Sequence, residues 1–294
     1  MLGAIATTLC FAVTPVFANA AAHRLGSLAA NAWRLALALL VLGAWVALAG
    51  RGCPSAARNW FVLGGVAGFG VGGVAMFLSL PRLGSSLSTL LVQCLSAVVA
   101  ASVEFVWLGQ TLTVGQLAWA AGTLAGIAIG LLPRSLPRVS PAQFRAGVGW
   151  AVLSAFGQGT GAVLSRKAFA TAAAEHVIVD PGTAAFLRAV GGLALGILVL
   201  AVAVRLRRSA WLRDARAWPW VLGNAITGPV LGVAFYQWAL RGAPAGIVQP
   251  IVAVAPLLTI PFAAWIEHAA APRMAYYAGS VLAIGGATGL VLAG

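Results

Sequence analysis

The sequence is divided into long apolar runs, each about as long as a membrane is thick. Cutting the 294 residues at arginines, prolines and polar turns leaves ten runs, at residues 2–21, 28–49, 60–80, 85–107, 113–132, 147–168, 183–204, 218–240, 243–266 and 274–293. A helix needs about 20 apolar residues to cross the hydrocarbon core. The runs are continuous rather than alternating, which argues against a membrane β-barrel. We predict an all-α integral membrane protein with ten transmembrane helices.

The composition supports a membrane protein and leaves little chain outside the bilayer. Hydrophobic residues make up 61% of the sequence and charged residues 8%, whereas soluble domains carry about 25% charged residues. Only the segments near 133–146, 169–182 and 205–217 are long enough for sizeable loops. Any function must therefore lie between the helices.

Two stretches of the chain repeat each other at a fixed spacing. Residues 61–82 align without a gap with residues 220–241, and eight of the aligned pairs are identical. Farther along, residues 86–123 align with residues 243–280 at nearly the same offset. We predict two repeats of five helices each.

The repeats place the boundary between residues 1–135 and 136–294. Because five is an odd number, the two copies must cross the membrane in opposite directions. Inverted repeats of this kind are typical of secondary transporters that work by alternating access around a central site.

Two further features carry a resemblance to a known family. An arginine opens the second run of each copy, Arg34 and Arg188, and the junction of the fourth and fifth runs reads WLGQTLTVGQLAWAAGTLAGIAIG. The chain resembles the drug/metabolite transporter superfamily, EamA-type, whose junction commonly reads L-G-E-x-L-T-x-x-Q. The family glutamate is Gln110 in the first copy, whereas Glu267 keeps it in the second.

The resemblance implies a basket of ten helices around a central cavity and non-enzymatic transport of small metabolites, often the export of amino acids. We expect a multi-pass protein of a plasma membrane, the inner membrane of a bacterium. Its partners would be a small-molecule substrate and the lipid bilayer.

Polar side chains at membrane depth are costly and usually face the interior of a bundle. The uncharged candidates for substrate binding are Gln93, Gln158, Asn224, Tyr236, Gln237 and Gln249. Their amides and hydroxyl suit a polar, even zwitterionic, metabolite, with Met76 and Trp238 as candidate apolar walls. The alternative is hydrogen bonding between helices without contact to cargo.

Charged residues within the runs are few. Arg34 and Arg188 are candidates for holding a substrate carboxylate or forming an ion-pair gate, and the alternative is that both reach the membrane interface. Glu104 is the acid that lies clearly inside a run, so it is the candidate for proton coupling. Glu267 ends the ninth run and is expected at the interface.

Prolines and glycines predict local shape. Pro250, Pro256 and Pro261 each remove a backbone donor, so the ninth run should be bent and line the cavity. The third run carries six glycines, and the fifth carries Gly122 and two more at four-residue spacing. We expect these small residues to let helices pack closely.

The sequence offers no sign of a metal, a cofactor or a catalytic centre. Its three cysteines (Cys10, Cys53 and Cys94) and three histidines (His23, His176 and His268) have no metal-ligand spacing. The net charge of +13 comes from arginines between the runs, which argues against nucleic-acid binding. A membrane enzyme acting on lipid-linked substrates and a non-transporting accessory subunit are the alternatives to a transporter.

The direction of insertion is left open by two conflicting indications. Basic residues are more numerous after the odd-numbered runs, led by the arginines of residues 205–216, which predicts that both termini lie outside. Members of the family are often drawn with both termini inside. Residues 17–20 resemble a signal-peptide cleavage site, but without a basic segment before them we expect the first run to remain as a helix.

Overall fold

The computed structural model describes residues 1–131, 139–206, 214–259 and 274–293, and every regular element in these ranges is a helix. The first half contains α1 (Leu2–Leu25), α2 (Ser27–Ala49), α3 (Ser55–Gly65), η1 (Val66–Gly72), α4 (Gly73–Leu108) and α5 (Val114–Leu131). The second half contains α6 (Pro141–Ala174), α7 (Pro181–Arg205), η2 (Ala215–Ala217), α8 (Trp218–Ala225), η3 (Ile226–Gly232), α9 (Val233–Gly242), α10 (Ala245–Val252) and α12 (Met274–Ala293).

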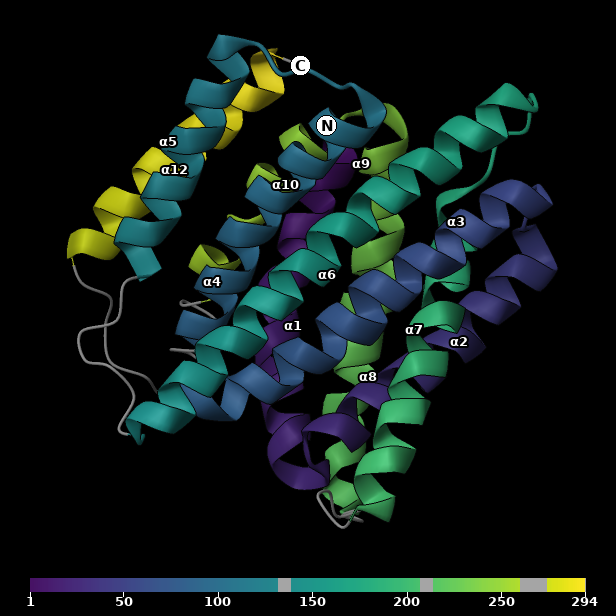
Figure 1. Ribbon diagram of the computed structural model, residues 1–294, viewed down its shortest axis with the longest axis vertical. Helices are drawn as coiled ribbons and strands as arrows, with labels where there is room; N and C mark the ends of the chain where they lie inside the picture. Colours follow the sequence, from purple (N-terminus) through teal and green to yellow (C-terminus); the bar gives the residue numbers. More distant parts are fainter. Residues whose placement is uncertain (132–138, 207–213, 260–273, 294) are drawn as a thin grey trace.

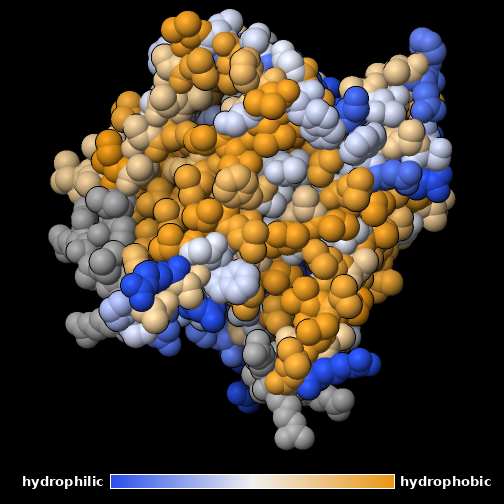
Figure 2. All heavy atoms as spheres, in the orientation of Figure 1, coloured by the Kyte–Doolittle hydropathy of each residue, from blue (hydrophilic) through white to orange (hydrophobic). Residues whose placement is uncertain are grey.

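Seven helices among the described residues are long and apolar enough to cross a membrane. They are Leu2–Leu25, Ser27–Ala49, Ser55–Gly84, Leu87–Leu108, Val114–Leu131, Pro181–Arg205 and Met274–Ala293. Large apolar side chains on these helices face outward, and Leu48, for example, is 88% exposed. Figure 2 shows hydrophobic residues across the middle of one face. The chain is an all-α, multi-pass integral membrane protein.

The other three predicted runs also coincide with helices. Residues 147–168 lie within α6, and residues 218–240 follow α8, η3 and α9. The run at 243–266 begins in α10, and its residues from 260 onward lie outside the described residues. The candidate acid Glu267, the proline Pro261 and the arginines Arg207, Arg208 and Arg213 also lie outside them.

The third and fourth runs join without a loop. Helical structure continues from α3 through η1 into α4, and the direction changes at Gly84, whose φ is 77° and ψ 168°. A positive φ is readily accessible only to glycine, so a residue without a Cβ makes the sharp change possible.

A π-helical segment interrupts the corresponding helix of each half. η1 follows α3, and η3 follows α8, and each is seven residues long. Pro229 lies inside η3 and has no N–H to donate, which favours the wider turn. The glycine-rich sequence of η1 has no proline. π-Helical turns are frequent at functional sites, and both segments reach the pocket described below.

The bend expected in the ninth run is present. α10 ends at Val252, residues 253–254 form a turn, and a short helical stretch follows at residues 255–259. Pro256 cannot donate to the carbonyl of Val252, so the helix opens there. Its counterpart in the first half, the end of α4, has no proline and stays helical from residue 85 to Leu108.

The helices form a bundle with one pair standing beside it (Figure 1). α1 runs through the middle of the bundle behind α4 and α6, while α5 and α12 lie against each other at one side. Both termini lie at the same end of the bundle. The arrangement leaves α1, α2, α4, α6, α7 and the two π-helical segments around the centre.

Close packing at glycine explains how α5 and α12 hold together. A Cβ added to Gly126 would lie 2.7 Å from the carbonyl oxygen of Gly279, and one added to Gly279 would lie 2.5 Å from that of Gly126. The backbones are therefore in direct contact. Gly122 is different, because a Cβ there would meet no described atom within 4 Å.

Some helices extend beyond the apolar runs that predict them. α6 begins at Pro141 and continues to Ala174, so the expected loops at 133–146 and 169–182 are shorter than predicted. A capping box at Ser140 and Gln143 fixes the start of α6, which explains why a helix forms in a polar stretch.

Candidate functional site

A pocket of about 140 Å³ lies at the centre of the bundle. That volume is large enough for a small metabolite rather than a single water molecule. The lining residues are Phe11, Thr14, Pro15, Ala18, Arg34, Gly68, Phe69, Gly73, Met76, Phe77, Leu80, Thr89, Gln93, Gln158, Arg188, Gly228, Pro229, Val233, Tyr236 and Gln249. They come from both halves of the chain, and none of them belongs to α5 or α12.

Arg34 reaches this pocket from α2. Arg34 is only 9% exposed. Its Nε–H donates to Oδ1 of Asn31, which lies 3.0 Å away and one helical turn earlier. Its guanidinium carbon lies 4.9 Å from the ring centre of Phe77 and 6.0 Å from that of Phe69. Such contacts are cation–π interactions, and they fix the direction of the side chain.

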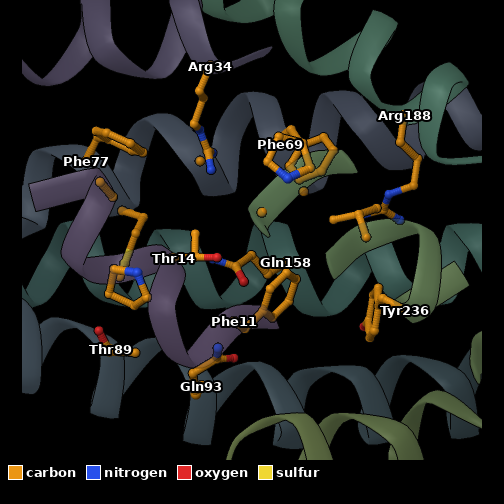
Figure 3. Close-up of a pocket in the computed structure, with 18 of the residues that line it drawn as sticks. Phe11, Thr14, Arg34, Phe69, Phe77, Thr89, Gln93, Gln158, Arg188 and Tyr236 are labelled. Atoms are coloured by element: carbon orange, nitrogen blue, oxygen red, sulfur yellow. The ribbon is translucent and has the colours of Figure 1, made fainter. Parts of the chain in front are cut away.

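Arg188 reaches the pocket from the equivalent place on α7. Its Nη1 donates to the carbonyl oxygen of Gly161 and to the hydroxyl of Ser165 on α6. Its guanidinium carbon lies 5.6 Å from the ring centre of Phe69, so both arginines share one aromatic ring (Figure 3). Arg34 and Arg188 therefore do not reach the membrane interface, which was the alternative expected from the sequence, because both are buried beside the pocket.

Glycine makes room for the two guanidinium groups. A Cβ added to Gly73 would lie 3.3 Å from Nη2 of Arg34, and one added to Gly68 would lie 2.7 Å from Nη2 of Arg188. The glycines of the third run therefore serve packing, as expected, and two of them also shape the pocket.

Four of the six uncharged candidates line the pocket. Gln93 lies across the pocket from the arginines in Figure 3, and its amide has no hydrogen-bond partner in the described part of the chain. Gln158 donates to Ser154, 3.1 Å away, and Gln249 donates to Ser96, 3.5 Å away. The hydroxyl of Tyr236 is buried and unpartnered among the described residues.

Asn224 and Gln237 are buried but are not among the lining residues. Both side chains are 0% exposed, and their amide atoms have no hydrogen-bond partner among the described residues. Their part in binding cargo stays a prediction. The two candidates for the apolar wall of the pocket differ in position. Met76 lines the pocket, whereas Trp238 is 41% exposed.

Glu104 lies outside the set of lining residues and holds four helices together. Its Oε1 accepts from Nε of Arg166 at 3.3 Å, and its Oε2 accepts from the backbone N–H of Gly246 at 3.0 Å. Arg166 also donates to the carbonyl oxygen of Leu240. These contacts tie α4, α6, α9 and α10 together and give Glu104 a structural role. Proton coupling through this residue stays a prediction.

Several residues of the pocket were not predicted from the sequence. Phe69 and Phe77 pack on the arginines, and Thr14 donates to the hydroxyl of Thr227, 3.0 Å away. Thr89 lies near Gln93 in Figure 3. The position of Thr14 next to Pro15 inside the first run was a usable signal, since proline marks irregular backbone that tends to line cavities.

A bundle of apolar helices around a central pocket that holds several polar and charged side chains is typical of a membrane transport protein. The sequence profile of the EamA-like transporter family matches residues 1–132 and again residues 145–292. The chain therefore belongs to the EamA-like transporter family of the drug/metabolite transporter superfamily, whose members are transporters and not enzymes.

The fold agrees with that of a solved protein. A structure described only as "Crystal structure of protein" superimposes with a TM-score of 0.73 at 22% sequence identity, covering 99% of this chain and 96% of that one. At this identity the likeness concerns the fold alone. Among curated proteins, none matches the sequence.

Proposed function

We propose that the protein is a secondary transporter that exports small polar metabolites, such as amino acids, by alternating access to the central pocket. The observation that carries the proposal is the pocket itself, a group of polar and charged side chains enclosed by an apolar bundle. Such residues are costly in a membrane and mark substrate pathways.

The proposal includes ten transmembrane helices arranged as two inverted repeats, residues 1–135 and 136–294. Support comes from the paired features of the two halves. Arg34 and Arg188 occupy equivalent places on α2 and α7, and the two π-helical segments occupy equivalent places in the third run of each half. The proposed location is the inner membrane of a bacterium.

Flux into liposomes tests the proposal. The purified protein is reconstituted, and uptake is measured for a panel of anionic, neutral, zwitterionic and cationic metabolites, with and without a proton gradient. We expect at least one compound to enter faster than into protein-free liposomes. A response to the gradient would support proton coupling, and its loss in Glu104→Gln would support coupling through Glu104. Uptake equal to that of protein-free liposomes for every compound would contradict transport.

A further inference from the structure

The positive charge of the pocket is not balanced by any acid in the described part of the chain. Two ion pairs occur there, Arg24 with Asp214 and Arg166 with Glu104, and none of these four residues lines the pocket. Arg34 and Arg188 each carry a buried positive charge without a carboxylate partner among the described residues. A buried charge of this kind is costly unless it is paired.

The two arginines differ in how many donors they have left. A guanidinium group has five N–H donors in a fixed planar arrangement. Arg188 uses Nη1 for two contacts on α6, and its Nε is buried without a partner. Arg34 uses only Nε, for Asn31, so both of its terminal nitrogens are free of hydrogen bonds to described residues. Figure 3 shows this end of Arg34 inside the pocket.

We propose that the pocket selects cargo with a net negative charge, and that the terminal nitrogens of Arg34 bind a carboxylate or phosphate group of this cargo. The inference rests on the proposed transport function and narrows its substrate class. Paired N–H donors of a guanidinium match the two oxygens of such a group. Arg188 adds a second positive charge from the other side of Phe69.

The same charges disfavour other cargo. An ammonium group on a zwitterion or a cation would face two guanidinium groups, and the described lining contains no acid to attract it. The rest of the cargo would meet neutral groups, namely the free amide of Gln93 and the unpartnered hydroxyl of Tyr236. Organic acids and phosphate esters, which carry no ammonium group, fit these conditions.

A series of matched probes tests the charge preference on the unchanged protein. Thermal unfolding in detergent at constant ionic strength is followed with glutarate, glutaramide and 4-aminobutanoate, which share a chain of three methylene groups, and with glycerol 3-phosphate and glycerol. A ligand that binds the folded state raises its melting temperature. We expect a rise with glutarate or glycerol 3-phosphate and none with their neutral or zwitterionic partners.

Three results would overturn the inference. They are an equal rise with a neutral or zwitterionic probe, no rise with either anion, and a rise that sodium chloride alone reproduces. The flux experiment separates this inference from the function on which it rests. Uptake of only neutral, zwitterionic or cationic compounds would overturn anion selection and leave transport intact, whereas no uptake of any compound would contradict transport itself.

Variants assign the preference to Arg34. We expect Arg34→Gln to weaken binding of the effective anion at least about tenfold, the loss of one charged hydrogen bond, and Arg34→Lys to retain part of it. Arg145 lies on an exposed face of α6, so Arg145→Gln removes the same charge away from the pocket and should bind normally. Unchanged binding in Arg34→Gln would overturn the assignment. If Arg34→Gln does not fold, Arg34→Lys provides the test, and affinity equal to that of the unchanged protein would overturn it.

Discussion

Arg34 shows how far a single residue departs from what its sequence position suggests. Its place near the start of a helix is compatible with a side chain that reaches the membrane interface. Phe69 and Phe77 instead hold it inside the bundle, and neither was recognisable as its neighbour because they lie on η1 and α4. The repeat predicted that Arg34 and Arg188 correspond, but only packing shows that they meet at one pocket.

Asp180, which lies outside the membrane-spanning segments, connects the start of α7 to α2 and to the segment that follows α2. As the N-cap of α7 it accepts hydrogen bonds from the amide and hydroxyl of Thr183, from Nε1 of Trp45 and from the amide of Arg51. Burial alone would raise the pKa of this carboxyl, but the hydrogen bonds outweigh burial and lower the pKa below its ordinary value of 3.8. These hydrogen bonds therefore favour the ionised carboxylate of Asp180.

We expect Asp180→Asn to lower the free energy of unfolding by about 0.5–2 kcal/mol at pH 7, because the neutral amide keeps only one acceptor oxygen and loses the charge that strengthens the hydrogen bonds. The folded-state pKa is depressed, so the stabilisation is present above about pH 4 and is lost as the pH falls through the folded-state pKa. Melting temperatures of both proteins in detergent, from pH 7 downward, check this. A difference that stays constant down to pH 3 would contradict the role of the charge.

At the scale of elements, the sequence predicted helices well and their irregularities less well. Apolar runs and prolines predicted the helices and the bend before Pro256. The π-helical segments were not predicted, because their backbone pattern depends on packing of η1 and η3 against neighbouring helices. The break between the third and fourth runs was expected at residues 81–84, but the sequence did not show that Gly84 alone makes the change of direction, without a loop.

Two glycine variants of α5 test the contact between α5 and α12. Gly126→Ala places a methyl group against the backbone of α12, whereas Gly122→Ala points into open space. We expect Gly126→Ala to lower the free energy of unfolding by about 1–3 kcal/mol, the usual cost of overpacking. Gly122→Ala should leave stability unchanged or slightly raised, because alanine favours a helix over glycine. Thermal unfolding in detergent measures both, and equal effects would show that contact with α12 is not the cause.

For the whole molecule, hydropathy and the internal repeat were enough to predict the class of protein, and the family match agrees with that prediction. Most of the candidate residues line the pocket because polar groups in an apolar bundle have few other places to lie. Asn224 and Gln237 are buried but do not line the pocket, a distinction that depends on helix rotation. The side of the membrane that each end faces stays a prediction.

The central claim is that one pocket, built by both halves of the chain, opens to each side of the membrane in turn. Its most direct test is labelling by a membrane-impermeant maleimide, in a protein whose cysteines Cys10, Cys53 and Cys94 have been replaced by serine. Met76→Cys places a thiol in the pocket, and Val98→Cys places one on the outer surface of the next span along the chain, Leu87–Leu108. We expect Met76→Cys to be labelled from both sides of the membrane and Val98→Cys from neither. Labelling of Met76→Cys from one side only, under every condition that supports transport, would contradict alternating access.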